Sequence, residues 1–250
     1  MIRFEHVYKT LGQTKVLQDF SFSAEKSKII CLIGPSGCGK TTILQLLAGL
    51  EQVDAGRITG TEGLLISYVF QEPRLLPWKT VADNIAFVLR DVVSPDRQQE
   101  LIRKYLTMMD LYDYWNNYPK ALSGGMKQRL ALCRALAFPH DLLLLDEPFL
   151  SLDIPLRLNL VRQVAGMWRN SPRTIVFVTH EIMDALLLGH RILVLSAKPA
   201  TVLDTVEIQI PLEQRDIGKE PLSTYYIRLL AWLKDESVSE VDSNKPWKMA

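Results

Sequence analysis

The chain has 250 residues, of which 48% are hydrophobic and 23% are charged, and its formal net charge is +1. Ample apolar material with so little net charge excludes a chain that is disordered throughout. The near-neutral balance also argues against a nucleic-acid partner, because such binders usually carry a clear basic excess.

No stretch of the chain has the pattern of a membrane span or an export signal. Uninterrupted apolar runs reach only about five residues, as at 29–33 and 229–233, whereas a spanning helix needs about 20. The N-terminal residues lack the apolar segment of a signal peptide. We therefore expect a cytosolic chain whose membrane role, if it has one, is peripheral and depends on a partner.

Three scattered cysteines, Cys31, Cys38 and Cys133, form no CxxC pair and no Cys/His cluster. This set predicts neither a disulfide framework nor a zinc site. We expect Cys31 and Cys133 to be small buried hydrophobes. Cys38 lies in a glycine-rich segment, where it could make that segment sensitive to thiol reagents.

Apolar patterning predicts the order of elements from the N-terminus. The first half contains strands at 2–7, 16–23 and 28–33, a helix at 40–50 and a strand at 65–70. Apolar residues then recur at helical spacing over 80–118, with a helix start at Ser94-Pro95. We interpret residues 72–122 as a helical insertion into an α/β core.

Strands and helices alternate again after this insertion. Helices are predicted at 123–138, 154–168 and 181–188, and strands at 142–145, 174–179, 192–195 and 201–210. A last helix carries the apolar stripe Tyr226, Leu229, Leu230 and Leu233. The pattern indicates one α/β domain over residues 1–235, followed by a polar tail at 236–250.

The sharpest motif is GPSGCGKTT at residues 34–42, which fits G-x-x-x-x-G-K-[ST] between a predicted strand and a predicted helix. Its glycines let consecutive backbone N–H groups surround a phosphate, and the helix N-terminus adds positive potential. Lys40 supplies a charge for the β- and γ-phosphates, and the Thr41 hydroxyl is a ligand for Mg²⁺. The predicted nucleotide-binding residues are Gly34, Pro35, Ser36, Gly37, Cys38, Gly39, Lys40, Thr41 and Thr42.

Two carboxylates end the predicted strand LLLLDEP at residues 142–148. A wholly apolar strand is typical of one buried on both faces. Its carboxyl end faces the crevice where open α/β sheets bind ligands. Asp146 would hold Mg²⁺, and Glu147 would orient or deprotonate the attacking water.

The segment ALSGGMKQR at residues 121–129 resembles the signature sequence of the ABC-type ATPases. Three further segments match that family in order: Gln71 resembles the Q-loop glutamine, Ser151-Leu152-Asp153 the D-loop, and His180 the switch histidine. The resemblance covers nearly the whole chain. It implies a P-loop NTPase fold of the ABC type, with an antiparallel β subdomain and a helical subdomain.

The same resemblance implies a mechanism based on a head-to-tail dimer of two cassettes, taken here as a homodimer. Each ATP would lie between the phosphate loop of one subunit and the LSGG segment of the other. Ser123, Gly124, Gly125 and Asp153 would then act across the interface. Gln71 and His180 would sense the γ-phosphate, Glu147 would be the base, and Gln71 would also contribute to the Mg²⁺ site.

Within the family, the segments EPFLSLD, FQEPRLLPW and VLSAKPA resemble importer cassettes for nitrate, sulfonates, taurine or pyrimidine precursors. Such cassettes lie at the cytoplasmic face of the cell membrane. They dock onto a separate permease through a groove beside the Q-loop, while a periplasmic or lipoprotein binding protein delivers the solute. Four aromatic residues either line this groove or pack the helical subdomain, and both interpretations stay open: Trp78, Tyr112, Tyr114 and Trp115.

Two departures from the family pattern bear on the site and the fold. Leu11 stands where the family usually has an aromatic that stacks on adenine, and the turn at 25–28 lacks the glycine expected before the next strand. The alternatives are a non-transport ABC ATPase, an exporter or lipid-transport cassette, and a regulatory cassette that only binds nucleotide. The presence of both Glu147 and His180 disfavours the last of these.

Overall fold

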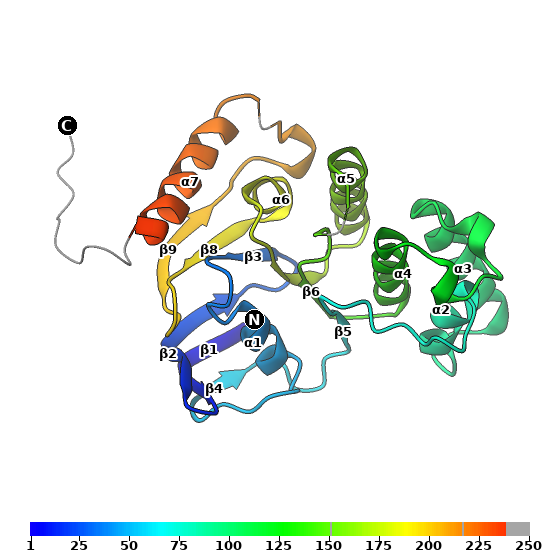
Figure 1. Ribbon diagram of the computed structural model, residues 1–250, viewed down its shortest axis with the longest axis horizontal. Coiled ribbons are helices and arrows are strands. Elements are labelled where there is room, and N and C mark those ends of the chain that lie inside the picture. Colours follow the sequence, from blue (N-terminus) through cyan, green and yellow to red (C-terminus); the bar gives the residue numbers. More distant parts are fainter. Residues whose placement is uncertain (151, 217, 239–250) are drawn as a thin grey trace.

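A computed structural model describes residues 1–150, 152–216 and 218–238. It contains a six-stranded sheet with strand order β5-β6-β7-β3-β8-β9 and a separate three-stranded sheet with order β2-β1-β4 (Figure 1). In Figure 1 the six-stranded sheet lies between the three-stranded sheet and the helices α2, α3 and α4. This is the predicted α/β architecture with an antiparallel sheet and a helical region.

The six-stranded sheet provides the frame of the molecule. Its strands β5, β6, β7, β3 and β8 are parallel, and β9 pairs antiparallel with β8. Every residue of β3, β6 and β7 is buried, as the apolar strand at 142–145 predicted. The bounds are β3 Ile29–Ile33, β5 Ile66–Val69, β6 Leu142–Asp146, β7 Thr174–Val178, β8 Arg191–Leu195 and β9 Val202–Glu207.

The two faces of this sheet support two separate apolar cores. Successive side chains of a strand point to opposite faces, and β3 shows the result. Cys31 and Ile33 pack into a core shared with α2 to α6, whereas Ile30 and Leu32 pack into a core shared with α1 and the antiparallel sheet. Cys31 is fully buried, as is Cys133 in the first core, which confirms both cysteine predictions.

The antiparallel sheet extends beyond its predicted limits. It consists of β1 (Ile2–Leu11), β2 (Thr14–Ala24) and β4 (Ala55–Thr59). Strand β1 continues past residue 7 because its end forms a hairpin with β2, in which Leu11 pairs with Thr14. Strand β4 was not predicted, because its sequence AGRIT carries little apolar alternation and its conformation depends on pairing with β1.

The turn before β3 explains one departure from the family pattern. Ser27 has φ 56°, in the left-handed region where glycine is usual. Its backbone N–H donates to Thr174 Oγ1 at 3.1 Å. The conformation expected of a glycine is therefore present, with serine in its place.

The helices follow the predicted order with shifted bounds. The stretch 80–118 forms two helices and a 3₁₀ turn, and Ser94-Pro95 begins the second helix as predicted. Helix α7 reaches Val238, and the remainder of the predicted tail (239–250) lies outside the described residues. The predicted limits of the domain (1–235) and of the helical insertion (72–122) stay predictions. The helices are α1 Lys40–Leu47, α2 Val81–Leu89, α3 Pro95–Met108, α4 Gly124–Ala137, α5 Ile154–Asn170, α6 Ile182–Leu188 and α7 Leu222–Val238, with 3₁₀ turns η1 Tyr112–Tyr114, η2 Pro119–Ala121 and η3 Leu212–Gln214.

The four aromatic residues with two open interpretations divide into two groups. Trp115 packs against the core shared by α2 to α6. Trp78 is 71% exposed, and Tyr112 and Tyr114 are also exposed, so core packing does not account for these three. Within the ranges that the structure describes, no helix has both the length and the apolarity needed to cross a membrane.

Candidate active site

The phosphate loop connects the end of β3 to the start of α1, as predicted. Gly39 has φ 124°, and a Cβ atom there would lie 2.7 Å from Val16 Cγ1. At Gly34 a Cβ atom would lie 2.9 Å from the backbone oxygen of Leu195. These two glycines are therefore required by the shape of the loop. The Cys38 side chain is only 1% exposed, which does not support the predicted sensitivity to thiol reagents.

The Lys40 side chain is buried inside this loop. Its ammonium group donates to the backbone oxygens of Gly34 and Pro35, both at 2.8 Å. The two carbonyls satisfy an amine that would otherwise be costly to bury. They also hold a positive charge next to the backbone N–H groups of the loop, so the loop has the electrostatic character of an anion site.

Asp146 ends strand β6 and faces the start of α1. Thr41 Oγ1 donates to Asp146 Oδ1 at 3.2 Å, and the Tyr68 hydroxyl lies 3.4 Å from Asp146 Oδ2. The carboxyl group is 2% exposed, and this burial raises its pKa, while the hydrogen bond from Thr41 opposes the shift. The strand and the loop, far apart in sequence, thus meet at one pair of oxygen-bearing side chains.

The oxygens of Thr41 and Asp146 are the hard donors that Mg²⁺ prefers. No group of three or more His, Cys, Asp or Glu residues able to hold a metal occurs in the described part of the chain. Such a sparse donor set fits Mg²⁺, which usually takes one or two protein ligands and completes its shell with phosphates and water.

Glu147 and His180 form the second pair at this end of the sheet. His180 Nδ1 lies 2.8 Å from Glu147 Oε2, within hydrogen-bonding distance. Glu147 has φ 47°, a strained conformation for a non-glycine residue. Its backbone N–H donates to Val178 O at 3.0 Å, which fixes it beside the strand that leads to His180.

Strand order explains why these groups converge. Strands β6, β7 and β3 are neighbours and parallel, so their carboxyl ends meet at one edge of the sheet. The residues that follow them are Glu147, His180 and the phosphate loop. This is the edge at which open α/β sheets bind ligands, and the sequence placed all three groups there.

The chain is similar to known proteins along most of its length. A family model described as ABC transporter matches residues 17–150. An aliphatic sulfonates import ATP-binding protein, SsuB of Bacillus cereus, is 38% identical over 81% of this chain and 82% of its own. The chain belongs to the ABC transporter family.

Two further similarities extend this result. The SsuB 1 protein of Pseudomonas savastanoi pv. phaseolicola is 38% identical, over 93% of this cassette and 92% of its own chain. A dimeric ATP-binding cassette bound to ADP and Pi superimposes with a TM-score of 0.75 and 26% identity, over 84% of this cassette and 100% of that chain. The cassette is an ATPase with the ABC-type P-loop fold, which confirms the predicted fold class and activity.

The remaining predicted residues of the cassette lie on separate elements. Gln71 follows β5, is exposed, and makes no side-chain hydrogen bond or ion pair within the described ranges. Ser123 caps α4 by accepting from the Met126 N–H at 3.3 Å, and Gly124 begins that helix beside Gly125. No hydrogen bond in the described part of the cassette joins this segment to the phosphate loop.

The D-loop and the predicted adenine contact complete the set. Asp153 caps α5, because its Oδ1 accepts from the Leu156 N–H at 3.0 Å, whereas Ser151 lies outside the described residues. Leu11 is 41% exposed at the end of β1, and Tyr8 on the same strand is similarly exposed. The roles of Asp153 and Leu11 stay predictions.

Two contacts near the site escaped the sequence-based reasoning. Tyr68 approaches Asp146 from the neighbouring strand, and Arg157 in α5 forms a bidentate ion pair with the buried Asp184 in α6 at 2.8–3.0 Å. Arg157 also lies 3.2 Å from Glu181, the residue after His180. A tyrosine on the strand beside the acidic strand was the one signal available for the first contact, and nothing in the spacing indicated the second.

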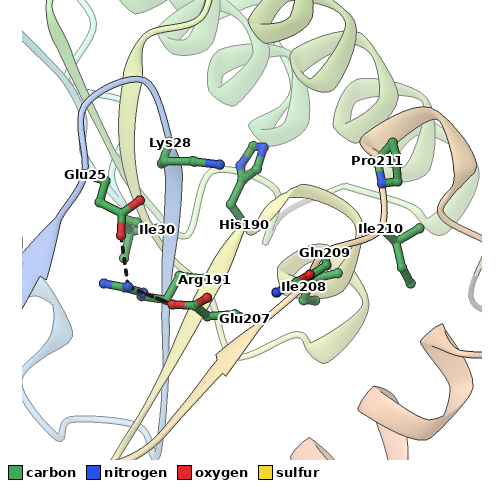
Figure 2. A pocket seen from close by; sticks show the side chains of 10 residues that line it. All are labelled: Glu25, Lys28, Ile30, His190, Arg191, Glu207, Ile208, Gln209, Ile210 and Pro211. Carbon is green, nitrogen blue, oxygen red and sulfur yellow. Dashed lines mark hydrogen bonds and ion pairs between the residues drawn. The ribbon is translucent and has the colours of Figure 1, made fainter.

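A cavity of about 340 Å³ lies at the opposite end of the strands (Figure 2). Lys28 and His190, which precede β3 and β8, border it together with Arg191. Arg191 forms ion pairs with Glu25 at 3.0 Å and Glu207 at 2.8 Å. Because ligands of such sheets bind at the carboxyl ends of the strands, this cavity is not the nucleotide site.

Proposed function

We propose that this cassette is the ATP-hydrolysing subunit of an importer for a small solute. The phosphate loop and Lys40 bind the phosphates of ATP, and Mg²⁺ is held by Thr41, Asp146 and Gln71. The contacts of Lys40 with the loop carbonyls and of Thr41 with Asp146 support these roles. Bound Mg²⁺ would neutralise charge on the β- and γ-phosphates.

Glu147 acts as the base that orients or deprotonates the attacking water, and His180 and Gln71 read the γ-phosphate. The hydrogen bond between Glu147 and His180 supports this assignment, since a base held by a neighbouring imidazole has a defined orientation. The strained backbone at Glu147 points the same way, because such strain concentrates at functional sites.

Two copies of the cassette form a head-to-tail dimer with ATP at the interface. Ser123, Gly124 and Gly125 at the start of α4 contact the γ-phosphate bound by the partner, and Asp153 also acts across the interface. A helix N-terminus favours an anion, and within one copy the described residues show no hydrogen bond from Ser123 to the loop. The dimeric structure of a similar cassette supports the arrangement.

The cassette docks from the cytoplasmic side onto a separate membrane permease through the exposed aromatics Trp78, Tyr112 and Tyr114. Exposed aromatic surface of this kind marks interaction sites. The observation that carries import is the similarity to sulfonate import ATP-binding proteins over most of the chain. The solute would be an organic anion such as a sulfonate, a nitrate-like anion or a pyrimidine precursor, delivered by a periplasmic or lipoprotein binding protein.

Affinity purification of the tagged cassette from native membranes, with mass spectrometry, tests this function. We expect a multi-span permease to copurify, and the Trp78→Ala variant to recover much less of it. Ile227→Ala is the matched control, because Ile227 is 67% exposed but lies on α7. Recovery of ribosomes or repair factors instead of a permease would leave the ATPase in place and contradict import.

A further inference from the structure

The buried carboxylate of Asp146 receives one hydrogen bond on each oxygen, from two different elements. Thr41 Oγ1 donates to Oδ1 at 3.2 Å, and the Tyr68 hydroxyl donates to Oδ2 at 3.4 Å. Strand β5, which carries Tyr68, is the parallel neighbour of β6, with Tyr68 paired to Leu144. The phenol therefore reaches the carboxylate from the side of the sheet, while Thr41 reaches it from the phosphate loop.

The hydroxyl groups of Thr41 and Tyr68 differ in whether they have a second proposed partner at the site. Thr41 is also a proposed ligand of the metal, so its hydrogen bond to Asp146 competes with that task. Tyr68 has no second task at the site. It can keep Oδ2 satisfied whichever partner Oδ1 takes. A buried carboxylate oxygen without a donor is costly, so this bond restricts the orientation of the whole group.

The ring of Tyr68 is itself held in place. Phe70 meets it edge-on, with ring centroids 4.1 Å apart and planes at 86°. The Arg74 guanidinium lies 3.9 Å from the centre of the Phe70 ring, a favourable cation–π distance. Arg134 in α4 donates to the backbone oxygens of Arg74 at 2.9 Å and of Pro73 at 3.2 Å. These contacts bracket Gln71 on both sides.

We propose that Tyr68 is a positioning residue for the metal site: it fixes Asp146 through Oδ2, so that Oδ1 faces the divalent cation bound with ATP. Through Phe70 and Arg74 the same tyrosine joins this carboxylate to the segment around Gln71. The inference rests on the proposed Mg²⁺ site at Thr41 and Asp146. It adds a residue that touches neither the metal nor the nucleotide.

The test measures metal affinity directly, with Mn²⁺ as the probe. Mn²⁺ is titrated into the cassette with saturating non-hydrolysable ATP analogue, and free Mn²⁺ is followed by electron paramagnetic resonance. Removing the partner of a metal ligand typically weakens metal binding 10- to 100-fold, so we expect Tyr68→Phe to raise the Kd for Mn²⁺ about ten-fold. The Mg²⁺ concentration at half-maximal ATPase rate should rise by a similar factor, with most of the rate recovered at saturating Mg²⁺.

Two further variants separate positioning from packing. Tyr118→Phe removes the hydroxyl of an exposed tyrosine and should leave the Kd unchanged. Phe70→Leu keeps the Tyr68 hydroxyl but removes its aromatic support, and should raise the Kd about three-fold, a smaller effect than loss of the hydrogen bond itself.

The outcomes distinguish this inference from the site on which it rests. Asp146→Asn should abolish tight Mn²⁺ binding. If it does, and Tyr68→Phe lowers the Tm but binds Mn²⁺ like the parent, the hydroxyl is only a packing contact and the inference is wrong. If Asp146→Asn binds Mn²⁺ as tightly as the parent, Mn²⁺ binding does not depend on Asp146. The proposed metal site is then wrong, and the role of Tyr68 fails with it.

Discussion

The two ends of the central sheet carry similar side chains with different consequences. Each end has a histidine, basic side chains and carboxylates, but they are paired differently at the two ends. At the amino end Arg191 is neutralised by Glu25 and Glu207, and His190 accepts the Ile29 N–H at 3.1 Å through Nδ1. Arg191 and its two carboxylate partners thus satisfy each other within the fold (Figure 2).

At the carboxyl end are the groups to which we assign nucleotide binding and catalysis. Lys40 lies in a loop of backbone donors, Glu147 is held in a strained conformation with a single histidine partner, and Asp146 faces a helix N-terminus. Parallel strands direct their carboxyl ends toward the ligand crevice. Residue type alone therefore does not mark a site, because strand direction decides whether a charged cluster faces a ligand or only the protein.

The largest expected effect is a loss of ATPase rate on substitution at the carboxyl end of the sheet, with the fold left intact. Glu147→Gln should lower the ATPase rate by about 10³-fold, since general bases contribute 10² to 10⁴. The amide can keep the contact with His180, so ATP binding, an ATP-induced dimer and the Tm should persist. Steady-state ATPase assays and gel filtration with ATP measure both. A variant that hydrolyses ATP at the parent rate would remove Glu147 from its role as base.

At the amino end of the central sheet, His190 should instead lower the free energy of unfolding as the pH falls. Burial, with Arg215 and Lys28 nearby, lowers the pKa of His190 to about 4. The unfolded chain, with a pKa near 6.5, takes up a proton first, so stability is lost as the pH falls from about 6.5 toward 4. Because the ring is only partly buried, solvent screening reduces the loss, and we expect about 1.5 kcal/mol.

Urea unfolding at a series of pH values checks this prediction. His190→Asn is the matched variant, because an amide oxygen can accept the Ile29 N–H without titrating. The parent should lose more stability than the variant between pH 6.5 and 4, and ATPase activity at pH 7.5 should be equal in the two. Parallel stability profiles would show that His190 titrates normally in the folded chain.

A smaller effect is expected on ATP affinity at Leu11, the predicted adenine contact. Leu11→Tyr should tighten ATP binding by up to about 1 kcal/mol, the usual contribution of an aromatic pair. Leu11 is exposed, so the larger ring fits without repacking a core. Isothermal titration with Glu147→Gln as background gives the affinity. An unchanged Kd would indicate that Leu11 does not line the adenine site.

The smallest effect concerns the turn at the amino end. Ser27→Gly should stabilise the fold by about 0.5 kcal/mol, because relief of the left-handed conformation outweighs the greater freedom of glycine when unfolded. The Ser27 N–H keeps its bond to Thr174, so activity should not change. Thermal unfolding measures the difference, and a lower Tm would mean that the Ser27 hydroxyl, 3.4 Å from Pro172 O, matters more than the backbone strain.

Local patterns predicted much of this molecule because their causes are local. The phosphate loop needs its own glycines, the strand at 142–145 needs only continuous apolar residues, and Ser94-Pro95 begins a helix by itself. Strand β4 was not predicted from its local sequence, because AGRIT forms a strand only when β1 is beside it. The stretch 80–118 was predicted to be helical with a helix start at Ser94-Pro95, and the structure has α3 begin at Pro95.

By itself the sequence determined the phosphate-binding motif, the acidic strand end, the family and the buried strands, since each depends on residues that are contiguous or nearly so. Only the tertiary structure decided that His180 meets Glu147, that Tyr68 reaches Asp146, and that Arg157 pairs with Asp184. Each of these contacts joins side chains 27 to 78 residues apart. The physical reason is strand order, because crossovers place distant segments side by side and no spacing along the chain records which side chains then meet.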